Sequence, residues 1–155
     1  MKILILLPTK QTNTDPLLKN ALEYLSKILS PYSCSYKFIK LSKKYEEKDA
    51  NIKKQKEALI FSELSKGYYT VALEERGKHF SSIEFCNFLQ KTSLFQSKIC
   101  FIIGGAFGLD RDFCNSCNIT MSLSALTLPH RLAFLVLCEQ LFRASQINIG
   151  SNYHK

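Results

Sequence analysis

Short segments rich in β-branched and aromatic residues alternate along this chain with longer segments of helix-forming pattern. This alternation restricts the fold more than any other feature, because consecutive parallel strands need a crossover of helical length between them. The sequence therefore predicts an α/β fold, with a parallel sheet flanked by helices. The predicted strands are residues 2–7, 35–41, 68–73, 99–103 and 119–123.

Capping residues mark where the helices begin. Asp15 followed by Pro16 is typical of an N-cap with proline in the first turn. Ser81 with Glu84 three residues later has the pattern of a capping box. The predicted helices are residues 15–29, a segment from Asp49 or Asn51 to about Lys66, residues 81–94, and residues 129–144.

Length and composition limit the class of protein. The chain has 155 residues, 46% of them hydrophobic and 22% charged, which predicts a single globular domain over residues 1–155. No apolar run approaches the ~20 residues of a membrane-spanning helix, so no membrane partner is expected. The apolar run at residues 3–7 ends at Pro8, and no cleavage site of small residues, as in a signal peptide, follows it. The run is therefore interpreted as the first strand.

The six cysteines lie scattered through apolar segments of a chain without an export signal. This usage favours reduced thiols and a cytoplasmic location. Cys114 and Cys117 form a C-x-x-C pair, and His130 follows at a zinc-finger spacing. The second histidine that such a site needs is missing three to five residues later, so no metal is expected. Redox use of the pair and simple packing on a helix face both remain open.

Positive charge is concentrated in one stretch. The formal net charge is +8, and residues 37–56 contain eight lysines against three acidic residues. Two interpretations stay open: a solvated loop and helix face, or a patch that binds RNA phosphates. Tyr45, among these lysines, slightly favours RNA, since aromatic rings stack on unpaired bases.

The last predicted helix has more apolar residues than one core-facing stripe requires. A helix buried within its own domain is one explanation, and a homodimer interface is the favoured one, since a domain of this size has little interior for such a helix. Glu139 and Arg143 are four residues apart and are able to pair on it. The apolar residues are Leu132, Phe134, Leu135, Val136, Leu137, Cys138, Leu141 and Phe142.

A glycine-rich segment, residues 104–108, follows the predicted strand 99–103. It is neither the G-x-G-x-x-G fingerprint nor a phosphate-binding P-loop, and it follows a late strand instead of the first one. An ordinary dinucleotide site is therefore disfavoured. Taken alone, such a segment is a tight turn more often than a ligand site.

Four segments together resemble the RlmH family of SPOUT methyltransferases. They are Leu73 to Lys78 with the serines that follow, Ile103 to Leu109, Ser122 to His130, and Tyr153 to Lys155. The resemblance spans the whole chain. It implies a C-terminal trefoil knot, a homodimer, S-adenosylmethionine as cofactor, and methylation of N3 of a pseudouridine in the helix 69 loop of 23S ribosomal RNA within the ribosome.

The resemblance also assigns residues. Carried over by position, cofactor contacts come from Leu73, Gly104, Leu123, Ser124, Ala125, Leu126, Thr127 and Leu128, and the residues implicated in catalysis or RNA binding are His130, Arg143, Tyr153 and His154. This sequence departs from many relatives at Ala106 and Phe107, which alters the expected rim of the pocket, and at the Pro8-Thr9 turn.

Methyl transfer from a sulfonium requires that the methyl group is aligned with N3 and that the N3 proton is removed. It needs no metal and no covalent intermediate. We hypothesise that His154 or His130 assists deprotonation, that Arg143 stabilises charge on the base, and that Tyr153 positions the ring. Two rival classes remain at this point: a non-catalytic RNA-binding module, and a nucleotide-dependent oxidoreductase that would use the glycines and the C-x-x-C pair.

Overall fold

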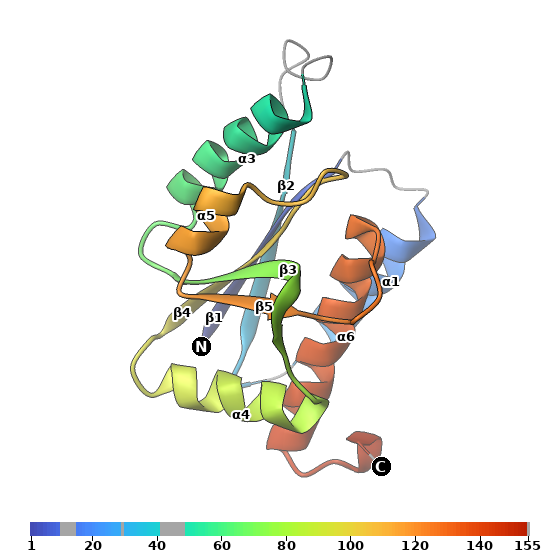
Figure 1. The fold of residues 1–155 in the computed structure, drawn as a ribbon. Coiled ribbons are helices and arrows are strands. Elements are labelled where there is room, and N and C mark those ends of the chain that lie inside the picture. Colours follow the sequence, from blue (N-terminus) through green and yellow to red (C-terminus); the bar gives the residue numbers. More distant parts are fainter. Residues whose placement is uncertain (10–14, 29, 41–48, 155) are drawn as a thin grey trace.

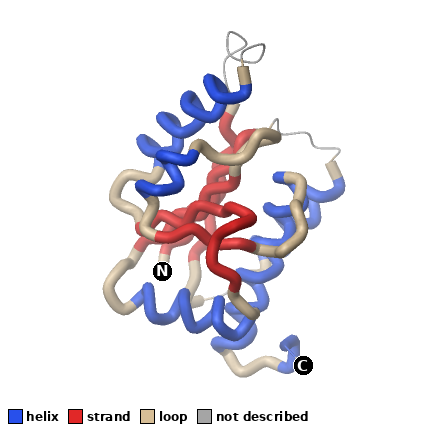
Figure 2. Tube along the Cα trace, viewed as in Figure 1, coloured by secondary structure: helices blue, strands red, loops and turns tan. Residues whose placement is uncertain are grey.

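The computed structural model describes residues 1–9, 15–28, 30–40 and 49–154. All five strands that these residues contain are parallel, in the order β2-β1-β4-β3-β5. Helices cover both faces of this central sheet (Figure 1, Figure 2). The α/β class and the parallel sheet are confirmed. The strands are β1 (Lys2–Pro8), β2 (Ser33–Ile39), β3 (Tyr69–His79), β4 (Lys98–Ile103) and β5 (Ile119–Ser122).

The predicted helix starts are confirmed by their caps. Asp15 accepts hydrogen bonds from the Leu17 and Leu18 backbone N–H groups, and Ser81 and Glu84 form both halves of a capping box. The last helix runs four residues beyond its predicted end, and a six-residue helix at 111–116 was not predicted. The helices are α1 (Pro16–Ser26), α3 (Ala50–Leu64), α4 (Ser82–Ser93), α5 (Arg111–Ser116), α6 (His130–Asn148) and the 3-10 helix η1 (Asn152–His154).

The sheet separates two apolar clusters. Ile3, Ile5 and Leu7 of β1 point to the side of α1, α4 and α6, whereas Leu6 points to the side of α3 and α5. Alternation along a buried strand thus serves both faces, as expected for a parallel sheet covered by helices. Among the described helices, none is long and apolar enough to cross a membrane.

Strand β3 extends further than predicted because it pairs with β5 a second time after an interruption. Leu73 and Lys78 both pair with Met121, so residues 74–77 are inserted between the two paired segments. At the end of the insertion a Cβ on Gly77 would lie 2.6 Å from the Met121 backbone, and only glycine permits this approach. The inserted residues are thereby directed to the carboxyl end of the sheet.

Helix α6 lies against α1 and α4 (Figure 1). One stripe, which includes Phe134, Leu137 and Leu141, is fully buried. A second stripe, which includes Leu132, Leu135 and Val136, is only half-buried by the described residues. The excess of apolar residues is therefore absorbed only in part by the domain's own core, against which Leu135 packs, and the homodimer stays a prediction.

Candidate functional site

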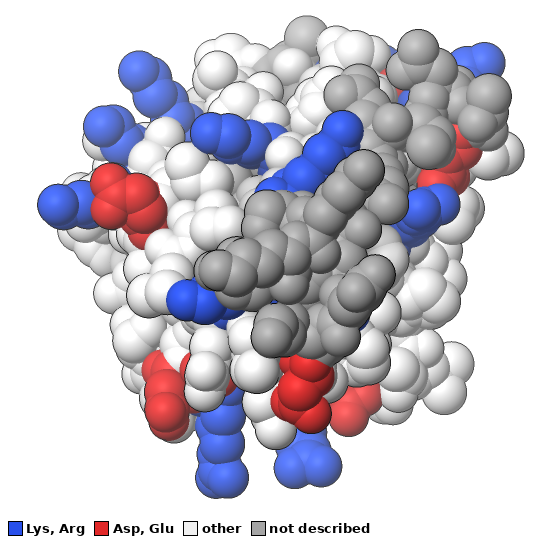
Figure 3. Space-filling model, turned by 90° about the horizontal axis from the view of Figure 1, so that it is seen from above, with Lys and Arg blue, Asp and Glu red and all other residues white. Residues whose placement is uncertain are grey.

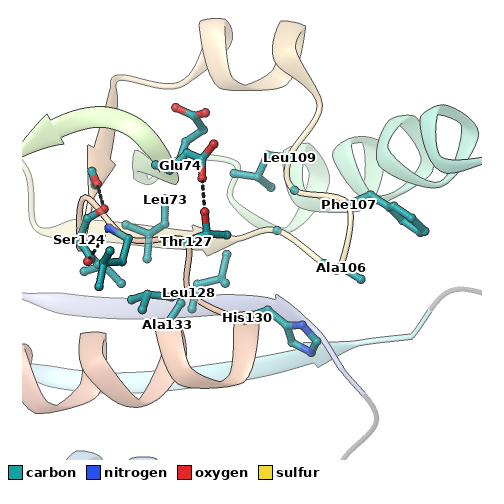
Figure 4. A pocket seen from close by; sticks show the side chains of 18 residues that line it. Leu73, Glu74, Ala106, Phe107, Leu109, Ser124, Thr127, Leu128, His130 and Ala133 are labelled. Atoms are coloured by element: carbon teal, nitrogen blue, oxygen red, sulfur yellow. Dashed lines mark hydrogen bonds between the residues drawn. The ribbon is translucent and has the colours of Figure 1, made fainter.

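A cavity of about 430 Å³ opens at the carboxyl ends of β3, β4 and β5 (Figure 4). Its volume is within the ordinary range of small-molecule sites. Loops that follow three strands meet here, as ligand-binding loops do in parallel α/β sheets. Its lining is Leu73, Glu74, Glu75, Ile103, Gly104, Gly105, Ala106, Phe107, Gly108, Leu109, Ser122, Leu123, Ser124, Leu126, Thr127, Leu128, His130 and Ala133.

The glycine segment after β4 forms a tight turn and lines the cavity as well. The Gly108 N–H donates to the Gly105 carbonyl oxygen at 3.0 Å, and Gly108 has φ +75°. A Cβ on Gly104 would lie 2.6 Å from the Gly108 carbonyl carbon and 2.7 Å from the Leu109 nitrogen. The turn therefore folds back on Gly104 so closely that any side chain there would displace it.

Helix α3, which lies on the face of the sheet opposite to α6, supports this turn. The Gly105 backbone N–H donates to the Glu57 carboxylate. Burial raises the pKa of Glu57, while the Gly105 hydrogen bond and the charge of Lys53 oppose that rise. A Cβ on Gly105 would lie 3.1 Å from Glu57 Oε1 and 3.2 Å from Pro8 Cγ, so the loop rests directly on both residues.

The loop after β5 is held by serine and threonine side chains. Ser122 Oγ donates to the Ser124 carbonyl oxygen at 2.8 Å, and the Leu126 N–H donates to Ser124 Oγ at 2.9 Å. Thr127 Oγ1 donates to Glu75 Oε2 at 2.9 Å and ties this loop to the inserted segment of β3. Leu126 is 75% exposed at the rim.

Seven of the eight predicted cofactor residues line this one cavity: Leu73, Gly104, Leu123, Ser124, Leu126, Thr127 and Leu128. Ala125 lies on the same loop and is exposed, but it is not among the lining residues. Glu74 and Glu75 line the cavity without having been predicted. The signal was present in the sequence, because two consecutive carboxylates follow directly after a predicted strand.

His130 is the first residue of α6 and lies at the edge of the cavity (Figure 4). Burial lowers the pKa of its imidazole, the neighbouring Arg131 lowers it further, and Asp15 opposes both. Arg131 Nη1 lies 2.5 Å from Asp15 Oδ2 in an ion pair that joins the starts of α6 and α1. The imidazole is thus held neutral near pH 7, the state in which it accepts a proton.

The other predicted catalytic residues lie at the far end of α6. Arg143 follows His130 by 13 positions on the same helix, which corresponds to about 20 Å. Arg143 donates to Glu139 Oε1 from Nη2 at 2.6 Å and from Nε at 3.0 Å, so the predicted pairing is confirmed. Its guanidinium also lies 4.8 Å from the centre of the Tyr153 ring. Within one chain, therefore, Arg143 and Tyr153 are not brought to the cavity.

Tyr153 and His154 belong to η1, which packs against α6. The Tyr153 hydroxyl donates to Glu139 Oε1 at 3.3 Å, and its ring packs edge-on against Phe142 with centroids 4.9 Å apart. Burial and the charge of Glu139 raise the pKa of the Tyr153 phenol. The side chain of His154 lies outside the described part of the chain.

The lysine-rich stretch is described only in part. Lys43, Lys44, Tyr45 and Lys48 lie outside the described residues, and Lys53, Lys54 and Lys56 lie on α3. Figure 3 looks down on the top of Figure 1 and shows Lys and Arg side chains at several places around that face, with fewer acidic groups among them. The described residues thus leave both interpretations of the stretch open.

The C-x-x-C pair lies at α5. Burial raises the pKa of the Cys114 thiol to about 11 and raises that of Cys117 as well, so both remain protonated near pH 7. Cys117 packs in the apolar cluster beneath α3 and α5. Among residues 1–9, 15–28, 30–40 and 49–154, no group of three or more His, Cys, Asp or Glu is placed to hold a metal ion. These environments favour the packing interpretation.

Known proteins resemble this chain along nearly its whole length. A family model described as "Predicted SPOUT methyltransferase" matches residues 1–154. The ribosomal RNA large subunit methyltransferase H of Pseudothermotoga lettingae is 37% identical over 132 residues, which cover 85% of this chain and 86% of that protein. The protein of the same name from Clostridium novyi is 37% identical over 145 residues, which cover 89% and 91%. That of Prochlorococcus marinus is 44% identical over 110 residues, which cover 71% and 74%.

Solved structures resemble the fold at low sequence identity. A probable methylase family protein from Haemophilus influenzae superimposes with a TM-score of 0.58 at 14% identity, covering 99% of this chain and 70% of that one. A probable methyltransferase from Bordetella pertussis gives a TM-score of 0.57 at 10% identity, covering 93% and 95%. At these identities the likeness concerns the fold alone.

Proposed function

The chain belongs to the SPOUT methyltransferase family, and from that premise we propose that it methylates N3 of pseudouridine 1915 in the helix 69 loop of 23S ribosomal RNA. The protein is a methyltransferase of the large-subunit ribosomal RNA class, and its cofactor is S-adenosylmethionine. The observation that carries the proposal is the convergence of the predicted cofactor residues on one cavity next to His130. The non-catalytic alternative leaves that convergence without a purpose.

The cavity residues fit this cofactor chemically. Leu73, Leu123 and Leu128 offer apolar surface for the adenine and thioether, and the Gly104 backbone forms part of the cavity wall. Glu74 and Glu75 supply negative charge, and no Lys or Arg is among the lining residues. When bound, the cofactor supplies an electrophilic methyl group whose sulfonium carries positive charge, which this lining favours.

His130 is the described residue best suited to accept the N3 proton of the target base. Its imidazole is neutral near pH 7 and lies at the edge of the cavity. Its position at the start of α6 is fixed by the ion pair of Arg131 with Asp15. Arg143 stabilises the negative charge that develops on the base carbonyl oxygens, Tyr153 positions the ring, and His154 is the alternative proton acceptor.

These roles require a second subunit, because Arg143 lies about 20 Å from His130 along α6. The half-buried stripe of α6 supports a two-fold homodimer in which two α6 helices run antiparallel. This arrangement brings the end of one helix beside the start of the other. Each cavity would then combine its own His130 with Arg143, Tyr153 and His154 of the partner subunit.

Mixed dimers test the shared site. His130→Ala and Arg143→Ala subunits, each inactive alone, are unfolded together, refolded and assayed. If the sites are shared, a mixed dimer contains one site with both residues intact, and activity returns to roughly a quarter of the wild-type level for random pairing. If each subunit holds a complete site of its own, both sites of the mixed dimer stay defective and no activity returns.

The reaction itself is tested with ribosomes from a strain that lacks the modification. Incubation with labelled S-adenosylmethionine should place the label on N3 of one pseudouridine, identified by nucleoside mass spectrometry. Label on another nucleotide would contradict the proposed substrate. Since the substrate is the ribosome, we place the enzyme in the cytoplasm.

We also propose that residues 1–155 form a single domain whose C-terminal part is tied in a trefoil knot. The close approach of Gly77 to the Met121 backbone supports this, because a threaded chain brings distant backbone segments into contact. An electron-density map that traces β5 and α6 through the loop formed by residues 74–109 would establish it, and a path around that loop would refute it.

A further inference from the structure

Phe107 is a large aromatic side chain that the core does not use. It lies with Ala106 at the tip of the turn closed by Gly105 and Gly108, and it is 56% exposed. Its side chain points away from the cavity, while its backbone belongs to the rim (Figure 4). The ring is therefore available to a ligand that approaches the rim of the cavity.

A lysine of another element accompanies this ring. Lys53 Nζ lies 5.4 Å from the centre of the Phe107 ring. The pair is held in place, because Glu57, one turn after Lys53 on α3, accepts the hydrogen bond from Gly105 at the base of the turn. Ring and cation thus come from two elements that are fixed to each other beside the cavity.

An aromatic face with an adjacent cation is the combination that proteins use for unpaired RNA bases. The ring stacks on the base without regard to its identity, and the cation contacts the phosphate that follows. The chain's net charge of +8 and the lysines of α3 favour a polyanion at this place. The surplus of positive charge therefore favours RNA over a protein partner.

We propose that Phe107 and Lys53 form a stacking platform for an unpaired nucleotide next to the methylated one. This proposal rests on the proposed function, since the target base must enter the cavity from the rim where the platform lies. Its neighbour in the RNA is then directed onto Phe107, with its phosphate near Lys53. The platform positions the substrate and takes no part in the chemistry.

The test compares Phe107→Ala with Phe107→Trp and with a matched control, Phe95→Ala. Phe95 is a similarly exposed aromatic, at 66%, but it precedes β4 at the opposite end of the sheet from the cavity. Three quantities are measured: kcat/KM on ribosomes that lack the modification, their dissociation constant, and the calorimetric dissociation constant of S-adenosylmethionine.

Phe107→Ala should lower kcat/KM and RNA affinity by roughly 10-fold, with cofactor affinity unchanged, whereas Phe107→Trp and Phe95→Ala should stay near the wild type. Lys53→Ala should weaken RNA binding and reduce its dependence on salt by about one phosphate contact. Equal RNA affinity in Phe107→Ala and wild type would overturn the platform. So would a loss of affinity for ribosomes that is absent for protein-free ribosomal RNA to which the wild type binds, since that outcome indicates a protein partner.

The platform and the proposed function fail in different ways. If the wild type transfers no methyl group, the proposed function fails, and the platform is still judged by the RNA dissociation constants. If the wild type methylates its target and Phe107→Ala does so equally well with equal affinity, only the platform fails.

Discussion

At its first residue α6 places a histidine of lowered pKa at a cavity, whereas 13 positions later the same helix carries an arginine whose charge is already satisfied by Glu139 and Tyr153. The start of the helix lines the cavity, whereas its end packs against Tyr153 of the C-terminal 3-10 helix. The contrast shows that the residues assigned to one reaction lie in two separate places on one chain, each stabilised by its own contacts. A site shared between two subunits, as proposed above, would bring them together.

The largest expected effect is at the start of the helix. His130→Ala should lower kcat by roughly 100- to 10,000-fold, the usual contribution of a general base, while cofactor affinity stays the same. The wild-type rate should fall as the pH drops through the histidine's pKa, which lies below the ordinary value of about 6.5. Rate measurements between pH 5 and 8 check this.

A His130→Ala variant that keeps the wild-type pH profile would assign the proton to another group. The catalytic base would then be sought at the other end of the helix, where His154 is the candidate. His79→Ala is a suitable control, because this histidine ends β3 and is not among the residues that line the cavity.

The next effect concerns the cavity that the helix start faces. Gly104→Ala should weaken S-adenosylmethionine binding by roughly 100-fold, since its Cβ would displace the Gly108–Leu109 backbone by the better part of an ångström. Calorimetry measures the affinity, and a thermal unfolding scan verifies the fold.

Gly150→Ala is the matched control for Gly104→Ala. Gly150 has φ +68° and open space around it, so the substitution costs about 1 kcal/mol of stability and leaves the cofactor affinity unchanged. Equal cofactor affinity in the two variants would mean that the glycine turn does not shape the site.

A smaller effect is expected from the Asp15–Arg131 ion pair, which supports the start of α6. Asp15→Ala removes the cap of α1 and the partner of Arg131 together, which should lower the free energy of unfolding by about 2–3 kcal/mol in urea denaturation. Asp49→Ala removes a single, exposed capping bond of α3 and should cost about 1 kcal/mol or less. Equal losses would contradict the structural role of the Asp15–Arg131 pair.

The smallest effect is expected at the end of the helix. Glu139→Gln keeps the shape of the side chain but removes the charge that faces Arg143, and should cost no more than about 1 kcal/mol, because this pair is partly exposed to solvent. Urea denaturation at two salt concentrations checks it, with a smaller difference at high salt. A cost comparable to that of Asp15→Ala would remove the contrast between the two ends.

The sequence predicted the five strands and the main helix starts because the capping residues and the alternation of apolar residues act locally. It missed α5, since six residues give no period to recognise. It also ended β3 at Leu73, because Glu-Glu-Arg-Gly-Lys has the composition of a turn. Only the approach of Met121 to Gly77, a contact between distant segments, extends that strand to His79.

The candidate site was predicted in a similarly uneven way. The cofactor residues lie in segments that the resemblance located, and all but Ala125 line one cavity. The separation of His130 from Arg143 was not predicted, although 13 positions on one helix imply it. The contacts of Glu57 with Gly105 and of Lys53 with Phe107 depend on how α3 packs, which no local pattern encodes.

The contact of the glycine turn with Glu57 connects a helix outside the cavity to the cavity's shape. Glu57 accepts a hydrogen bond from the Gly105 N–H, and a Cβ on Gly105 would lie 3.1 Å from Glu57 Oε1. A substitution on α3 would therefore alter cofactor binding through the turn, although α3 supplies no residue that lines the cavity.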